Sequence, residues 1–183
     1  MRLFFGVFPP PPVRDEVVRA LERVRRSGPS VRWAGQAKWH VTLQFLGELD
    51  EQQRATAEQI AREIAPLQAR FSVAFRGLGV FPDERHASVL WLGLRESEGL
   101  RVLADALHAS LVAAGFSLDE RPYHPHLTLA RIKTRKEADE VRAILAQAPR
   151  VESSAFDVGS FALIESRGGA YLPLTDFTLA TAR

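Results

Sequence analysis

The chain has 183 residues, enough for one domain or for two small lobes that share a core. It has no cysteine, which excludes disulfide scaffolds, thiolate metal sites and cysteine nucleophiles. A net charge of only +2 argues against a histone-like electrostatic binder, while local arginine patches still allow contact with nucleic acid. The first apolar run, Leu3 to Phe8, is too short for a signal peptide core or a membrane span, so we expect a soluble cytoplasmic protein without a membrane partner.

The first elements in chain order are a strand and a helix. Leu3 to Phe8 predicts a buried strand, which the prolines Pro9 to Pro12 end. Proline is favourable in a first helical turn, where its missing N–H group would have no partner, so Pro12 suits a helix start. The helix ends near Gly28, and one apolar stripe at helical spacing consists of Val13, Val17, Val18, Leu21 and Val24.

The middle of the chain predicts three strands and two helices. A strand covers Trp39 to Leu46, and Asp50 to Gln53 then has the pattern of a capping box for a helix with Ile60 and Ile64. Two paired strands follow, and a third helix ends at Gly115; their residues are Phe71 to Val80, Ser88 to Leu94, and the stripe Leu100, Leu103, Leu107 and Leu111.

The last third repeats this order. A strand from Leu127 to Ile132 precedes a second capping box, Thr134 to Glu137, and a helix with Val141 and Leu145. Two more strands complete the chain, near Phe156 to Glu165 and Tyr171 to Leu179.

The two halves of the chain therefore match. Each gives a strand, a helix, a strand with a His-x-Thr motif, a capped helix and further strands, and the two motifs are 86 residues apart. We expect an α+β fold with a single two-lobed domain over residues 1–183, made of repeat halves of roughly 1–86 and 87–183. In this arrangement antiparallel sheets surround a central groove, with helices on the outside.

The repeated motif is the main functional signal. His40-Val41-Thr42-Leu43 recurs as His126-Leu127-Thr128-Leu129, although the chain has only five histidines. Residues two apart on a strand share a face, so each motif presents an imidazole beside a hydroxyl, away from the core. The same alternation predicts Gln44 on the face of His40 and Phe45 on the buried face.

Two imidazoles at one groove suit general acid–base catalysis, because one can be neutral and accept a proton while the other is protonated and donates one. The hydroxyls of Thr42 and Thr128 would bind phosphate oxygens as charge develops on them. His124 and His126 also have a metal-binding spacing, but nothing in the sequence singles out a third ligand. We therefore expect neither a metal nor a cofactor.

The two motifs, with RLFFGVFPP, GVFPDERHASVLWLGL and the late LIESR, resemble the 2H phosphoesterase superfamily. Within it the chain is similar to RNA 2′,3′-cyclic phosphodiesterases, also called 2′-5′ RNA ligases. This resemblance implies that His40 is the proton donor and His126 the proton acceptor. It also implies phosphate contact by Arg131, although strict alternation would turn that side chain away unless a bulge intervenes.

The implied function is hydrolysis of RNA 2′,3′-cyclic phosphate ends to 2′-phosphates. The implied substrate is RNA with such an end, tRNA fragments included, and the expected state is a monomer. Three alternatives are a phosphodiesterase for small cyclic nucleotides, a reversible 2′-5′ RNA ligase and a non-catalytic RNA-binding module. Lys38 is a further candidate for phosphate contact, and the candidates for base stacking are Phe8, Trp33, Trp39 and Phe81.

Overall fold

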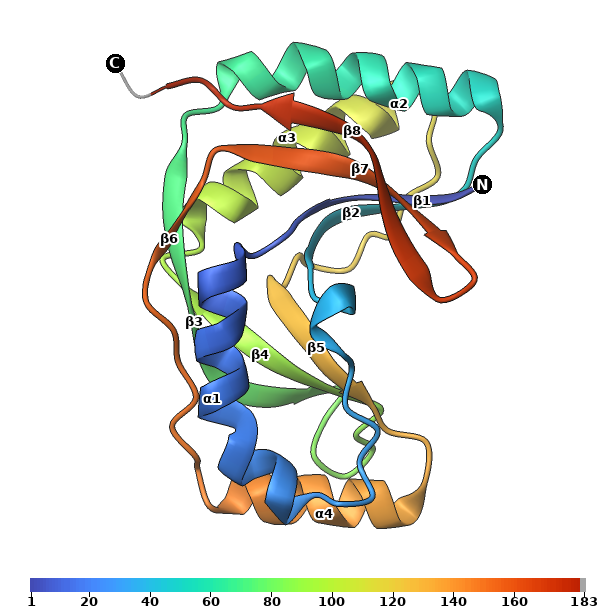
Figure 1. Cartoon of the computed structure of the whole chain (residues 1–183). Coiled ribbons are helices and arrows are strands. Elements are labelled where there is room, and N and C mark those ends of the chain that lie inside the picture. Colours follow the sequence, from blue (N-terminus) through green and yellow to red (C-terminus); the bar gives the residue numbers. More distant parts are fainter. Residues whose placement is uncertain (182–183) are drawn as a thin grey trace.

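The computed structural model describes residues 1–181 (Figure 1). The helices are α1 (Pro11–Ser27), α2 (Glu51–Ile64), α3 (Glu98–Ala113) and α4 (Arg135–Ala146), with short 3-10 turns η1 (Gln36–Lys38) and η2 (Ala65–Leu67). The strands are β1 (Arg2–Val7), β2 (Val41–Glu48), β3 (Phe71–Phe81), β4 (Val89–Arg95), β5 (His126–Arg131), β6 (Phe156–Val158), β7 (Ser160–Arg167) and β8 (Ala170–Thr178). The predicted α+β class is confirmed.

Both predicted capping boxes are present. The carboxylate of Asp50 accepts a hydrogen bond from the backbone of Gln53, whose side chain bonds back to the backbone of Asp50. Thr134 and Glu137 do the same at the start of α4. Helix α1 begins with prolines in its first turn, as the sequence predicted.

The eight strands form one curled antiparallel sheet in the order β6-β3-β4-β5-β2-β1-β7-β8. This order is symmetric about the junction of β5 and β2. The motif strands β2 and β5 lie at the centre, β1 and β4 beside them, and β7 and β3 outside these. Strand β3, from the first half of the chain, pairs with β4 from the second half. Strand β7, from the second half, pairs with β1 from the first.

The prediction of one strand near Phe156 to Glu165 is wrong in one respect. The chain breaks at Gly159, and β6 pairs with β3 at one edge of the sheet while β7 pairs with β1 on the other side of the junction. The segment therefore passes from one group of strands to the other. The carbonyl of Gly159 accepts a hydrogen bond from the backbone of Leu179 at this crossing.

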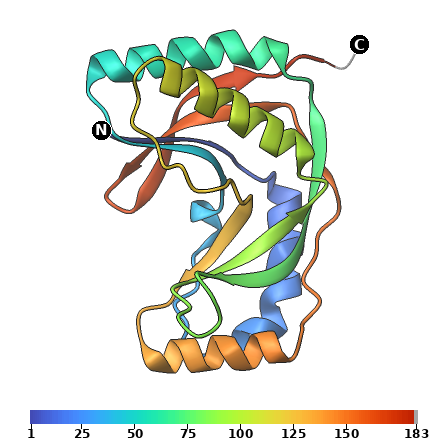
Figure 2. The same ribbon diagram turned by 180° about the vertical axis from the view of Figure 1, so that it is seen from behind.

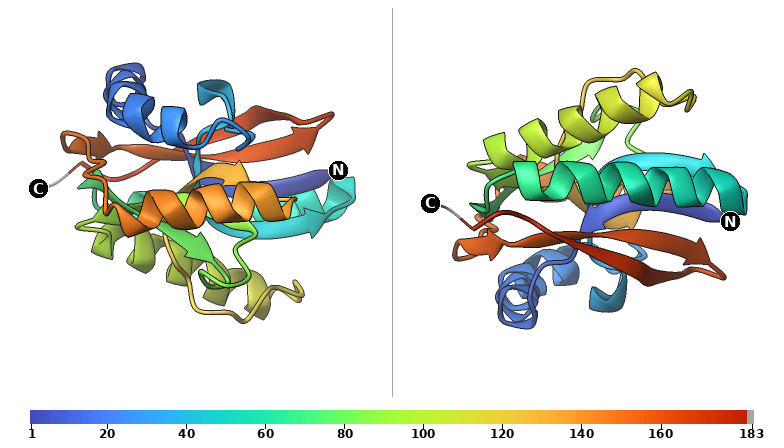
Figure 3. Two further views of the ribbon diagram at one scale, coloured as in Figure 1. Left: turned by 90° about the horizontal axis from the view of Figure 1, so that it is seen from below. Right: turned by 90° about the horizontal axis from the view of Figure 1, so that it is seen from above.

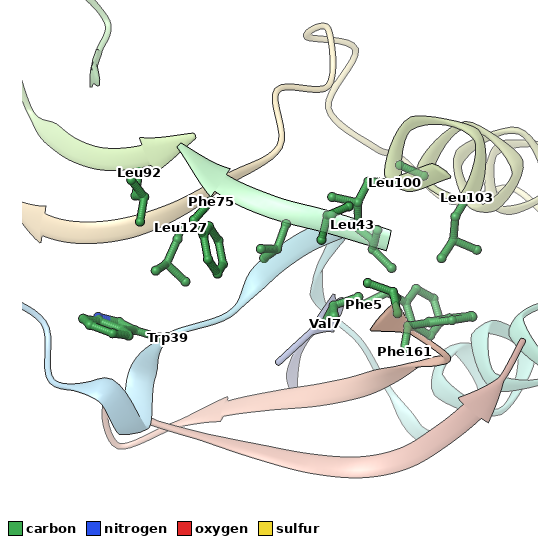
Figure 4. Close-up of a cluster of buried hydrophobic side chains, with 14 of the residues drawn as sticks. Phe5, Val7, Trp39, Leu43, Phe75, Leu92, Leu100, Leu103, Leu127 and Phe161 are labelled. Atoms are coloured by element: carbon green, nitrogen blue, oxygen red, sulfur yellow. The ribbon is translucent and has the colours of Figure 1, made fainter. Parts of the chain in front are cut away.

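The helices pack in two pairs. Helices α2 and α3 lie together at one end of the molecule and α1 and α4 at the other (Figures 1 and 2). Their apolar stripes face a single core that contains residues of both strand groups, including Phe5, Leu43, Phe75, Leu127 and Phe161 (Figure 4). Because this core is continuous across the junction, it holds the two motif strands rigidly together. No helix within residues 1–181 is both long and apolar enough to cross a membrane.

A small second cluster lies on the other face of the sheet. It consists of Phe4, Ala162 and Ile164, with Phe8 and Tyr171 packed against it. Tyr171 belongs to the β7–β8 hairpin, whose turn projects on the side of the N-terminus (Figures 1 and 3). This cluster supports the ring of His40, which contacts Phe4, Phe8 and Tyr171.

Candidate active site

The two motifs meet at the centre of the sheet. Strand β2 pairs with β5 through the opposed residues Val41 and Leu127, and both side chains are buried. His40 directly precedes Val41, and His126 directly precedes Leu127. The two histidines therefore flank the one strand pairing that joins the two groups of strands. The predicted convergence of the motifs arises from adjacency in one sheet.

The backbone that leads to His40 is fixed on both sides. The side chain of Trp39 is only 1% exposed, and its indole N–H donates to the carbonyl of Ala34 at 3.2 Å. The backbone N–H of Ala34 in turn donates to the carbonyl of Leu129 at 2.7 Å. Through these bonds the approach to the first motif is tied to the strand of the second, which limits how far the two histidines can move relative to each other.

Both imidazoles are oriented by the same local hydrogen bond. Nδ1 of His40 lies 2.9 Å from the carbonyl oxygen of Lys38, and Nδ1 of His126 lies 2.7 Å from the carbonyl oxygen of His124. A carbonyl oxygen can only accept, so Nδ1 carries a hydrogen in both rings. Nε2 is then the nitrogen left to exchange a proton with a substrate.

Aromatic side chains surround both rings. Phe4 and Tyr171 have ring centroids 4.8 and 4.5 Å from that of His40. Phe81 and Trp91 have centroids 5.0 and 6.4 Å from that of His126. Trp91 can lie across β3 because Gly79 opposite it has no side chain, and a Cβ atom there would overlap the indole.

Burial by these rings lowers the pKa of both histidines below the usual value, because it disfavours the charged form. The hydrogen bonds to Lys38 and His124 act in the opposite direction. The charge of Arg131 lowers the pKa of both rings further, and that of His126 lowers the pKa of His40. The protein surroundings of the two rings thus favour neutral imidazoles.

Thr42 and Thr128 are half-buried and lie at equivalent positions in the two strands. Thr42 is opposite Gly6 on β1, and Thr128 is opposite Trp91 on β4. The residue directly before each threonine, Val41 or Leu127, is buried in the core. Alternation along the strand therefore turns the threonine side chains to the face opposite the core, as the sequence predicted.

Each motif strand has an extra residue directly after its threonine. On β2 the register passes from Thr42 to Gln44 while β1 advances by one residue, and on β5 it passes from Thr128 to Ala130 while β4 advances by one. Such a bulge reverses the alternation of faces beyond it. The prediction for Gln44 and Phe45 is therefore wrong. Gln44 is buried and lies 3.1 Å from Nδ1 of His108 on α3, while Phe45 is 43% exposed.

The bulge on β5 also settles the alternation problem for Arg131. Leu129 and Ala130 are both buried, and the next side chain, Arg131, is exposed. The extra residue thus places Arg131 on the face of His126 and Thr128 instead of the opposite face. Its positive charge is one of the causes that lower the pKa of both histidines.

The remaining candidate residues differ in whether they lie beside the two histidines. Phe8 and Phe81 lie beside His40 and His126, whereas Trp39 is buried and Trp33 contacts the guanidinium of Arg25. Lys38 and His124 provide the backbone carbonyls that orient the rings of His40 and His126. Within residues 1–181, no three His, Asp, Glu or Cys side chains lie close enough together to form a metal site.

The sequence did not single out Tyr123, Tyr171, Trp91 or Phe4. The hydroxyl of Tyr123 donates to the backbone carbonyl of Thr42 at 3.0 Å, which ties the approach to the second motif to the first strand. Burial raises the pKa of this phenol, so it remains a donor. Only the short spacing between Tyr123 and His126 could have suggested it, because the pairing is non-local.

The chain matches the family described as the 2′-5′ RNA ligase superfamily over residues 8–170. It is 34% identical over 195 aligned positions to an RNA 2′,3′-cyclic phosphodiesterase from Thermus thermophilus, with 98% of this chain and 90% of the relative covered. A Methanothermobacter thermautotrophicus protein of the same name is 30% identical over 166 positions, covering 91% and 90%. A crystal structure from Thermus thermophilus superposes with a TM-score of 0.78 at 30% identity and full coverage of both chains.

Proposed function

The chain belongs to the 2′-5′ RNA ligase superfamily and shares the RNA 2′,3′-cyclic phosphodiesterase activity of its curated relatives, and we propose that its two motif histidines perform this reaction without a metal ion. The substrate is RNA with a 2′,3′-cyclic phosphate end, tRNA fragments included, and the product end is a 2′-phosphate. The observation that carries the proposal is the matched pair of imidazoles, each with Nδ1 bonded to a backbone carbonyl and Nε2 left for the substrate.

In the proposed reaction, Nε2 of His126 takes a proton from the attacking water. The oxygen of that water bonds to phosphorus, and the bond between phosphorus and the 3′ oxygen breaks. Nε2 of His40 gives its proton to the departing 3′ oxygen. Family resemblance supports this division of roles, since the pseudo-symmetric geometry alone favours neither direction. The two histidines exchange protonation states in one turnover, and solvent restores them.

The threonines and Arg131 stabilise the charge that grows on the non-bridging oxygens. Thr42 and Thr128 lie two residues after each histidine on the same face, which suits their hydroxyls to donate to these oxygens. Arg131 adds a fixed positive charge on this face, and guanidinium geometry is suited to phosphate. All of these residues come from one chain, which supports a monomer as the working unit.

The lowered pKa values fit the proposed roles once substrate is included. A neutral His126 is ready to accept a proton, which its burial favours. His40 must be protonated, and the negative charge of a bound phosphodiester raises its pKa again by favouring the imidazolium. Substrate binding therefore favours the protonated acid, whereas burial by the protein alone favours its neutral form.

A product map tests the proposal. Purified protein is incubated with an oligonucleotide that ends in a 2′,3′-cyclic phosphate, with and without EDTA, and the product ends are identified as 2′- or 3′-phosphate. We expect a 2′-phosphate at the same rate in both. Loss of the rate with EDTA and its return with zinc or manganese would replace the acid–base pair by a metal-activated water. Tight binding without turnover would indicate an RNA-binding module.

A further inference from the structure

A basic pocket lies beyond the end of the catalytic strand β5. It has a volume of about 480 Å³ and is formed by the β3–β4 loop, the residues that follow β5 and the first turns of α4. Its positively charged side chains are Arg85, Lys133, Arg135 and Arg142. None of them belongs to the site described above.

The charges in this pocket are unbalanced. Asp139 is the only carboxylate in its lining, against four Lys and Arg side chains. Asp139 lies 3.0 Å from the guanidinium of Arg142 and 4.0 Å from that of Arg135. Asp83, on the same loop as Arg85, accepts backbone N–H groups and so caps the loop without lining the pocket. The pocket is thus suited to anions.

Two elements connect the pocket with the catalytic residues. The loop that carries Arg85 begins directly after Phe81, whose ring contacts that of His126. The other wall begins with Ile132, directly after Arg131. With about 3.3 Å per strand residue, Ile132 lies roughly 20 Å along the strand from His126. Arg131 lies between them, so positive charge continues from the catalytic face to the pocket.

We propose that this pocket binds backbone phosphates of the RNA strand several nucleotides before its cyclic end. The inference rests on the proposed function, since it gives that substrate a second point of attachment. A polynucleotide suits this line of positive charge because it carries one phosphate per nucleotide along its length. A single small anion would occupy only the catalytic site or only the pocket. At about 3.4 Å per nucleotide in a stacked strand, the pocket is reached within about six nucleotides.

The test compares variants in the pocket with a control variant elsewhere, and the control is matched through two similar pairs of arginine and carboxylate. Arg142 is 49% exposed and pairs with Asp139 on α4, and Arg62 is 51% exposed and pairs with Glu58 on α2. The variants are Arg85→Gln with Arg142→Gln, and Arg62→Gln as the control. For each, kcat/KM is measured with a cyclic mononucleotide and with cyclic-ended RNAs from two to about eight nucleotides. Binding of an RNA with an ordinary 3′-hydroxyl end is titrated against salt.

For the double variant we expect the preference for the longest RNA over the mononucleotide to fall by about tenfold or more, because two charged contacts are lost. The slope of log affinity against log salt should become shallower by about 1.4, at roughly 0.7 per lost contact with a single strand. The control should keep both values. The proposed role of the pocket would be contradicted by an unchanged salt slope, or by an equal loss of kcat/KM on the mononucleotide and on the long RNA. Because the binding assay uses RNA without a cyclic end, it still tests the pocket if the wild-type protein hydrolyses nothing.

Discussion

The ring of His126 is held by the carbonyl oxygen of His124, 2.7 Å from its Nδ1 atom. The same bond, 2.9 Å long, joins His40 to Lys38 two residues before it. Each motif therefore orients its own imidazole through a hydrogen bond to its own backbone. This makes the two rings separately replaceable, and the consequences of replacing them can be stated residue by residue.

His40→Ala and His126→Ala should each lower turnover by roughly 10²–10⁴, the usual scale of general acid–base catalysis. Both proteins should fold, because neither ring belongs to the main core. The measurement is kcat on a cyclic-ended oligonucleotide, with thermal unfolding to check folding. His108→Gln on α3 is the control and should keep its turnover. Near-normal turnover in either alanine variant would contradict the paired assignment.

Thr42→Val and Thr128→Val keep the β-branched shape of the side chain but remove its hydroxyl. If each hydroxyl donates to the phosphate in the transition state, each variant should lose up to about 3–4 kcal/mol of transition-state stabilisation, by comparison with oxyanion-hole donors. The effect should be on kcat more than on KM. Valine variants with unchanged kcat would reduce the threonines to strand-forming residues.

The pH profile follows from the lowered pKa of both histidines. In kcat/KM, which reports the free enzyme, the base must be neutral and the acid protonated, so both limbs should lie below 6.5. The limbs belong to the coupled pair. The profile of kcat should lie at higher pH, because bound phosphate favours the protonated form.

Tyr171→Ala tests the cause of this shift. The variant removes part of the burial of His40, so at least one limb of kcat/KM should move up towards 6.5. Measuring the profile in both proteins over the same buffers is sufficient. If both limbs stay in place, the rings around His40 do not set its pKa.

Glu137 should make stability depend on pH in a defined window. Its side chain is buried and accepts hydrogen bonds from the backbone of Lys133 and from Arg32, and its pKa is lowered from 4.5 to about 2. The folded state therefore holds the ionised form more strongly than the unfolded state does. This stabilisation is complete above about 4.5 and is lost as the pH falls towards 2.

Glu137→Gln should accordingly have a lower Tm than the wild type at neutral pH, and the difference should shrink as the pH falls from 4.5 to 2. Circular dichroism melts at a series of pH values measure this. Glu63→Gln, at an exposed position on α2, should change stability by less than about 0.5 kcal/mol. A constant difference between wild type and Glu137→Gln across the window would contradict the linkage.

Local patterns predicted most of the elements and both motif faces. The capping boxes depend on residues three apart, and the faces of His40 and Thr42 depend on alternation over three residues, so both can be seen in sequence. The bulges after Thr42 and Thr128 cannot be recognised in the sequence, because they depend on the register of a neighbouring strand. For this reason strict alternation puts Gln44 and Phe45 on the wrong faces and cannot decide the position of Arg131.

The aromatic side chains that surround the two histidines could not be predicted from the sequence either. Tyr171 reaches His40 through pairing of β8 with β7 and of β7 with β1, which joins residues far apart in the chain. Trp91 reaches His126 because Gly79 on β3 leaves room for its ring. Such contacts depend on strand order, and the sequence repeat does not indicate that β3 and β7 lie beside strands of the opposite half.

The exchange of β3 and β7 makes the two halves of the fold depend on each other. A polypeptide with only the first half would have β1, β2 and β3, yet β3 would lack β4, its neighbour in the sheet. Two copies of such a polypeptide could complete each other by lending their third strands reciprocally. A polypeptide with only the second half would in the same way leave β7 without β1, so a single copy of either half has an incomplete sheet.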